Sequence, residues 1–224
     1  MSTIRAQNFE RLARAGFRAA QWLPTERGDK RELRPLEEIG ARLFALDALF
    51  TWVAFPEESA ASERVRMYAR HNDAAAWLTA EEREIFELPR QDAHAGHVGT
   101  IGWRLENMWP LAWVLGFAAE PAFDGAMMPR ELQRAMLLEF LPGLDKRVSD
   151  LLGRQPTRSY AEVDALEDLF YCAHNAARSA QLGHDTVPPG FHPISGGGVV
   201  HERRHALTWC VSPGVAWNDT DLST

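Results

Sequence analysis

One segment near the C-terminus has residue types at a spacing that could bind zinc. His201, Glu202 and His205 match the pattern His-Glu-x-x-His, in which two histidines one helical turn apart bind the metal and the glutamate activates water. Helical projection argues against this chemistry, because both histidines fall on the polar side with Arg204 and Thr208. The arginines between them would also repel a metal cation. A zinc-dependent hydrolase is therefore the least favoured function, and His201 and His205 form only a formal metal pair.

Arg203, in contrast, points into the middle of the apolar arc of the same predicted helix, residues 199–211, with Glu202 beside it. A buried guanidinium is costly unless a carboxylate meets it. The candidate carboxylates are Glu106 and Asp168, which belong to two other predicted helices. We therefore expect three helices to pack together through a shared polar network.

The first of these helices, residues 103–117, is apolar around its whole circumference and rich in tryptophan. A helix without a polar face is expected at the centre of a domain. Arg104 and Glu106 lie near its start, and Pro110 removes a backbone hydrogen bond and should kink it. Charges at such a place need either partners or an opening to water, and a structural ion pair is favoured over a pocket.

The second helix has the best marked boundaries in the chain. Ser159 and Glu162 form a capping box before a helix from Tyr160 to Leu182, and Gly183 ends it. Its polar residues line up on one face: Asp164, Asp168, Tyr171, Asn175 and Arg178, with His174 at the margin. This row is either solvated surface or the set of groups that an acid–base site or a polar interface would use.

Apolar residues recur at helical spacing along most of the chain, whereas strand signals are sparse. The remaining helices are predicted over residues 5–22, from Pro35 to just before Pro56, over 63–77, between Thr79 and Pro89, over 129–141 and in a short piece ending near Gly153. Residues 90–99 are predicted as a flexible linker, and residues 186–198 as a turn-rich connection. The sequence thus predicts a mainly α protein: a single-domain helical bundle, residues 1–224, around a buried Trp-rich central helix, with little or no β structure.

Composition narrows the classes of partner. The formal charge is −7, and no run of five or more basic residues could neutralise phosphates, so nucleic acid is not an expected partner. Cys172 and Cys210 lie far apart inside helical patterns, which suits reduced thiols in the cytoplasm. No apolar stretch has the length of a signal peptide or a membrane span, so no membrane association is expected. No cofactor-binding motif is recognised.

Several short stretches lie along most of the chain: Trp103-Arg104-Leu105-Glu106, Arg158-Ser159, Asp168, Tyr171, His174, Val199-Val200-His201-Glu202-Arg203 and Trp217-Asn218-Asp219. In this order they resemble a bacterial family catalogued as domain of unknown function 4272. The family commonly has Trp after the helix histidine and Asp in the tail, where this chain has Asn175 and Asn218, and it does not require a histidine at His201. The resemblance brings no reaction or cofactor, but it supports one polar set: Arg104, Glu106, Asp168, His174, Glu202 and Arg203.

Two functions from different classes fit these observations. The favoured one is a non-catalytic cytosolic binding or interaction protein, regulatory or similar to immunity proteins, whose partner is another protein. The alternative is a small-molecule hydrolase with its site in a cleft between helices. Glu106, Asp168 and Glu202 would be its acids and bases, His174 a proton shuttle, and Arg104 or Arg203 the anion holder. A homodimer is compatible with the sequence but is not indicated by it.

Overall fold

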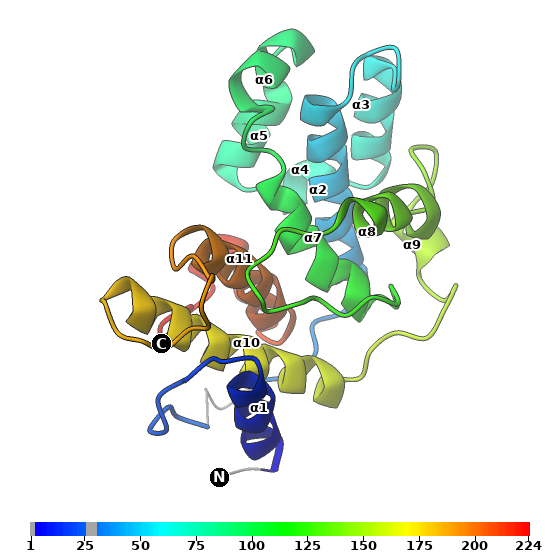
Figure 1. Cartoon of the computed structure of the whole chain (residues 1–224). Helices are drawn as coiled ribbons and strands as arrows, with labels where there is room; N and C mark the ends of the chain where they lie inside the picture. The colour runs from blue at the N-terminus through cyan, green and yellow to red at the C-terminus, as the bar shows by residue number, and fades with distance from the viewer. Residues whose placement is uncertain (1–2, 26–30) are drawn as a thin grey trace. The chain divides into compact units, whose positions relative to one another are not determined.

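The computed structural model describes residues 3–25 and 31–224, and its regular structure there is helical, without a strand (Figure 1). The predicted mainly α fold is confirmed. The chain forms two compact units, unit 1 from Met1–Arg34, Glu120–Met127 and Arg158–Thr224, and unit 2 from Pro35–Ala119 and Met128–Thr157. Whether both fold together as the predicted single domain stays a prediction, and each unit is described by itself.

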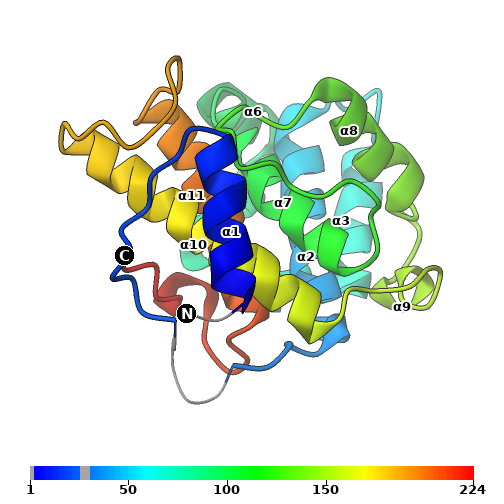
Figure 2. The same cartoon turned by 60° about the horizontal axis from the view of Figure 1, so that its bottom comes forward.

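Unit 1 is built on two long helices. Its elements are α1 (Thr3–Arg14), α10 (Tyr160–Gln181), α11 (Ser195–Cys210) and the 3₁₀ helix η2 (Trp217–Asp219). The helix α10 packs along α11 on one side and contacts α1 on another, so that α1 lies across it (Figure 2). Its start is the predicted capping box, since Ser159 accepts from the backbone of Glu162 and the Glu162 side chain accepts in return.

The first helix is shorter than the predicted 5–22, because it ends at Arg14. Gly16 adopts a left-handed φ of 85°, which a glycine tolerates and which stops the helix. The amide of Gly16 then donates to Ala13 and that of Phe17 to Leu12, the two bonds of a Schellman motif. Apolar residues recur at helical spacing beyond Gly16, so the sequence pattern predicts a longer helix. The backbone nevertheless leaves the helical conformation at this glycine.

The helix α11 begins at Ser195, so the predicted connection 186–198 is wrong over its last four residues. Three glycines there suggested a turn, since glycine weakens a helix. Gly196 instead packs closely inside the helix, since a Cβ atom at that position would lie 3.1 Å from the ring of Phe191, a tight contact. The close approach of the Phe191 ring favours a residue without a side chain at this position.

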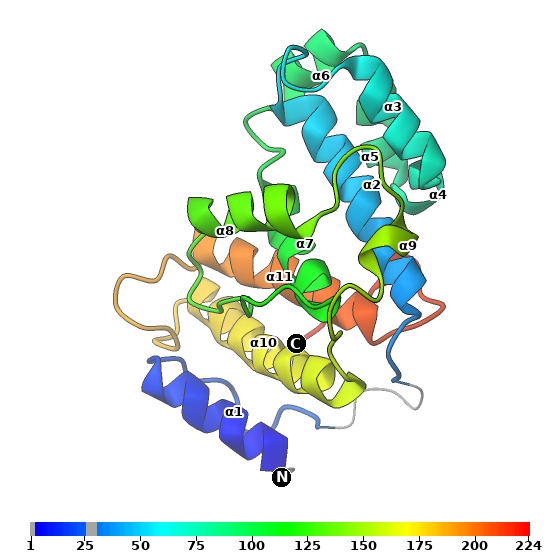
Figure 3. The ribbon, with the colours of Figure 1, turned by 90° about the vertical axis from the view of Figure 1, so that its right-hand side faces the viewer.

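Unit 2 surrounds two buried helices. Its elements are α2 (Leu36–Ala54), α3 (Ser62–His71), α4 (Ala74–Trp77), α5 (Ala80–Glu87), α6 (Arg90–His97), α7 (Trp103–Val114), α8 (Arg130–Arg134), the π-helix η1 (Ala135–Phe140) and α9 (Val148–Leu151). Every residue of α7 from Leu105 onward is buried, which confirms the predicted Trp-rich central helix. It shares the centre with α2, whose other neighbours include α3 and α4 (Figure 3).

The predicted flexible linker 90–99 is wrong, because residues 90–97 form the helix α6. Its first residue, Arg90, is buried and donates to carbonyls near the end of α2, among them those of Thr51 and Phe55. The Nδ1 atom of His94 contacts another, the Val53 carbonyl, at 2.8 Å. Small and polar residues suggested a solvated loop, but tertiary hydrogen bonds hold the segment against α2.

A second capping box does more than start a helix. Thr79 and Glu82 form the capping box at the start of α5. Glu82 also receives two hydrogen bonds from Arg42, of 2.6 and 2.9 Å, and lies 3.3 Å from Arg104. Burial alone would raise the pKa of Glu82, but the two arginines and the cap hydrogen bond lower it below its ordinary value.

Replacing Arg42 with Met should therefore destabilise the protein. Removing one partner of a buried ion pair leaves the other charge insufficiently compensated, at a cost of about 3–5 kcal/mol. Urea unfolding measures the change. The matched control is Arg70→Met, an exposed arginine of α3 whose loss should change the free energy of unfolding by less than about 0.5 kcal/mol. Equal effects of the two variants would contradict this role of the pair.

Candidate functional site

The predicted polar set is divided between the two units: Arg104 and Glu106 lie on α7 in unit 2, and the other four residues lie in unit 1. In unit 2, Arg104 pairs with Glu82. Glu106 is fully buried and accepts a hydrogen bond of 2.9 Å from the backbone amide of Met128. Arg104 and Glu106 therefore both have partners within unit 2.

Asp168 is held by α1. Arg5 donates to both its carboxylate oxygens at 3.0, 3.0 and 2.6 Å, and Asn8 donates to Oδ2 at 2.9 Å. Arg5 is buried and also reaches the carbonyls of Leu23 and Pro24. Sequence reasoning missed Arg5, although it lies on the same face of its helix as Leu12, two turns away, where an inward arginine could have been noticed.

Arg203 is fully buried, as its helical position predicts. It donates to the backbone carbonyls of Ala122 and Ala126, in the segment Glu120–Met127 of unit 1. Of the two predicted acidic partners, Asp168 is the counter-ion of Arg5, and pairing with Glu106, a residue of the other unit, stays a prediction. The neighbouring Glu202 is half-buried.

Two histidines and an arginine form a chain of contacts between α10 and α11. Arg204 donates to Nδ1 of His174 at 2.7 Å, and Nε2 of His174 lies 3.4 Å from Nδ1 of His201. Burial and the positive charge of Arg204 lower the pKa of His174 to about 3. Because a guanidinium only donates, Nδ1 of His174 must accept, and the single proton of the neutral ring is on Nε2.

The ring nitrogens of His201 and His205 bear on whether this formal zinc pair could bind a metal ion. The Nε2 atom of His205 lies 2.8 Å from the carbonyl of Trp217, so this nitrogen carries a proton. Burial lowers the pKa of His201, with the adjacent Glu202 opposing the shift. Within residues 3–25 and 31–224, no three His, Cys, Asp or Glu side chains are grouped so that they could hold a metal ion.

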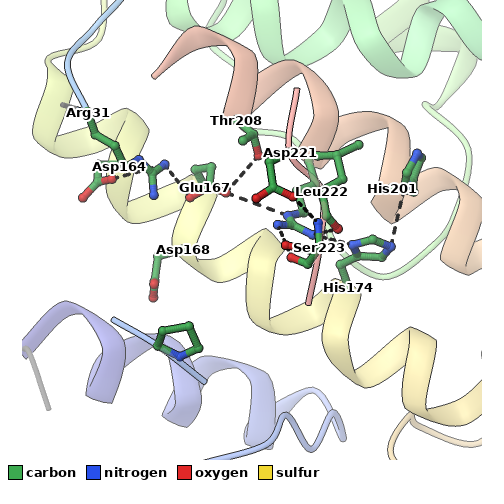
Figure 4. A network of polar contacts seen from close by, with 12 residues as sticks. Arg31, Asp164, Glu167, Asp168, His174, His201, Thr208, Asp221, Leu222 and Ser223 are labelled. Atoms are coloured by element: carbon green, nitrogen blue, oxygen red, sulfur yellow. Dashed lines mark hydrogen bonds and ion pairs between the residues drawn. The ribbon is translucent and has the colours of Figure 1, made fainter. Parts of the chain in front are cut away.

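The polar side of α11 is less exposed than predicted. Arg204 and Thr208 are both buried, and Thr208 donates a hydrogen bond of 2.9 Å to Glu167 of α10. The carbonyls of Leu222 and Ser223 accept hydrogen bonds of 2.8 and 3.0 Å from Arg204 (Figure 4). A helical projection shows neither the tail that follows the helix nor the neighbouring helix α10, so the prediction that these two residues lie on the solvent side is wrong.

Beside this chain of contacts lies a hollow of about 430 Å³. It is lined by Pro24, Arg31, Glu167, Tyr171, Arg204, Thr208, Ser212, Val215, Asp219, Asp221 and Ser223. Glu167 is buried, accepts from Arg31 at 2.7 Å and Thr208 at 2.9 Å, and lies 3.8 Å from Arg204 (Figure 4). Sequence reasoning missed Glu167, although it falls on the apolar face of α10, one turn from both Val163 and Phe170.

The fold and this site define a helical protein whose buried arginines are met by carboxylates and backbone carbonyls. The profile of a family described as domain of unknown function (DUF4272) matches residues 5–220. The chain belongs to this family. Neither the curated proteins nor the solved structures contain a match. Among the described residues, no helix has the length and apolar character needed to cross a membrane.

The depressed pKa of His174 predicts a stability that falls in acid. The unfolded chain binds a proton at this ring below about pH 6.5, whereas the folded protein does so only near pH 3. The stabilisation is therefore complete above pH 6.5 and is lost as the pH falls toward 3, by up to about 1.4 kcal/mol per pH unit. Chemical unfolding between pH 4 and 7 measures this slope.

The variant His174→Gln should have a smaller slope than the wild type, because glutamine does not titrate. The exposed His184, changed to Gln in the same unit, is the control and should keep the full slope. Identical slopes for all three proteins would show that His174 is not held neutral by its surroundings.

Proposed function

We propose that this protein is a non-catalytic binding protein of the bacterial cytoplasm and that its partner is another protein. The observation that carries the proposal is the engagement of the groups that an acid–base mechanism would need. Asp168 is bound by Arg5 and Asn8, and Glu167 by Arg31 and Thr208. These hydrogen bonds occupy the carboxylate oxygens that a substrate would otherwise have to reach.

His174 supports the same proposal. A general base is most effective when its pKa lies near the working pH. The pKa of His174 is lowered to about 3 by burial and Arg204, far below neutrality. Its hydrogen bonds to Arg204 and His201 make it a connector of α10 and α11 in unit 1 rather than a shuttle.

The charges accessible at the hollow indicate the chemistry of the partner. Asp219 and Asp221 are exposed at its edge, whereas Arg204 is buried and Arg31 is mostly covered. A backbone hydrogen bond from Ser223 lowers the pKa of Asp221, so this carboxylate is charged at neutral pH. The partner should therefore present basic side chains to the hollow.

The two cysteines are buried and unbridged, which suits a reducing compartment.

The test combines partner capture with a turnover assay. Immobilised wild-type protein should retain a partner from host lysate at low salt and release it at high salt, since exposed charges are screened. Asp219→Arg should lose that partner, whereas Glu87→Arg, an equal charge change on an exposed residue of α5, should keep it. Both variants should unfold like the wild type.

The hydrolase alternative predicts a different pattern. A panel of esters, phosphoesters and amides would then be turned over by the wild type, and Asp168→Asn or His174→Gln would abolish turnover without global unfolding. Turnover of this kind, together with no partner that distinguishes the two charge variants, would overturn the proposal.

A further inference from the structure

A second hollow, of about 450 Å³, lies within unit 2 beside the π-helix η1. Its apolar lining includes Phe55, Ala60, Leu137, Leu138, Leu141 and Pro142. From α2 it receives two polar side chains one helical turn apart, Asp47 and Thr51. A π-helical turn is rare and is frequently found at functional sites.

Asp47 is the unusual member of this lining. Asp47 is only 7% exposed, yet it lines the hollow. The Oδ2 atom accepts a hydrogen bond of 2.9 Å from the hydroxyl of Tyr68. Within the described part of the chain, Oδ1 has no hydrogen-bond partner and no cation pairs with the carboxylate. Every other buried carboxylate described above has a basic or amide partner.

Burial raises the pKa of Asp47 to about 7, with the hydrogen bond from Tyr68 opposing the shift. The titratable and charged groups near it are few. Tyr68 faces it from α3, and Arg64 of the same helix lines the hollow from an exposed position. The lining residues from η1 and the segment after it are apolar or glycine. A carboxyl group at the wall of an apolar hollow thus lacks a counter-ion.

We propose that this hollow is a binding site for a small amphipathic amine. The ammonium group would donate to Oδ1 of Asp47 and contact the hydroxyl of Thr51, while an alkyl chain would pack against Phe55, Leu137 and Leu138. Such a ligand supplies the missing positive charge and covers apolar surface at once. A carboxylate ligand is disfavoured because it would meet the ionised Asp47 in an environment of low dielectric. This site is independent of the protein partner proposed for unit 1.

The ionisation of Asp47 determines how the affinity for an amine should depend on pH. An alkylammonium group, like that of lysine, stays protonated up to about pH 10. Only the ionised form of Asp47 attracts it, so binding should strengthen as the pH rises through about 7 and level off above it. From this pKa, affinity at pH 5 should be about 100-fold lower than at pH 8.

Calorimetric titration of the full chain with n-hexylamine at pH 5 and pH 8 tests the site, with n-hexanol as the uncharged probe. The proposal expects hexylamine to bind at pH 8 with the stated loss at pH 5, and hexanol to bind weakly without pH dependence. Asp47→Asn, which keeps the side-chain shape, should bind both probes weakly at both pH values. Leu138→Ala should weaken hexylamine binding several-fold without unfolding, because Leu138 is already 63% exposed.

Two results would overturn the proposal. One is the absence of hexylamine binding to the wild type at pH 8, which needs no variant to interpret. The other is equal binding of hexylamine and hexanol at both pH values, which would mean that the hollow takes apolar chains without using Asp47. Loss of the protein partner by Asp219→Arg has no bearing on either result, so failure of the two proposals is distinguishable.

Discussion

The fold depends on one constraint: a guanidinium group stays charged in a protein, so an arginine that is buried must find acceptors for its donors. Six arginines are buried in the described chain: Arg5, Arg34, Arg42, Arg90, Arg203 and Arg204. Each reaches acceptors on segments distant in sequence, as Arg34 does with the carbonyls of Trp209, Ser212 and Val215. Within unit 1 these bonds tie irregular segments to α10 and α11, and within unit 2 they tie α5 and α6 to α2.

The same constraint accounts for the partners of several residues that resemble a catalytic set. Carboxylates such as Asp168 and Glu82 are buried as the counter-charges of arginines, and burial together with the charge of Arg204 lowers the pKa of His174 so that it stays neutral. Asp47 is the informative exception: it is also buried inside unit 2, but among the described residues no cation forms an ion pair with it. A group of this kind fits a ligand better than a scaffold role.

The sequence predicted the features of the fold that depend on residues close together in the chain. The capping box at Ser159 and the apolar circumference of α7 predicted a helix start and a buried centre, because both depend on residues close in sequence. The end of α1, the start of α11 and the helix α6 were missed, since they depend on Gly16, on contacts of Gly196 and on Arg90. For the site, burial of Arg203 was predicted, but the partner of Asp168 was not, because a periodic pattern gives the face of a helix and not what meets it.

The most direct test of the structural role of these charges is a double-mutant cycle on Arg5 and Asp168, measured by urea unfolding of Arg5→Met, Asp168→Asn and the double variant. Each single change leaves a buried group without its counter-charge and should cost about 3–5 kcal/mol. The double variant should cost less than the sum, with a coupling energy of at least about 1.5 kcal/mol. Single changes that cost under about 1 kcal/mol with no coupling would contradict the account.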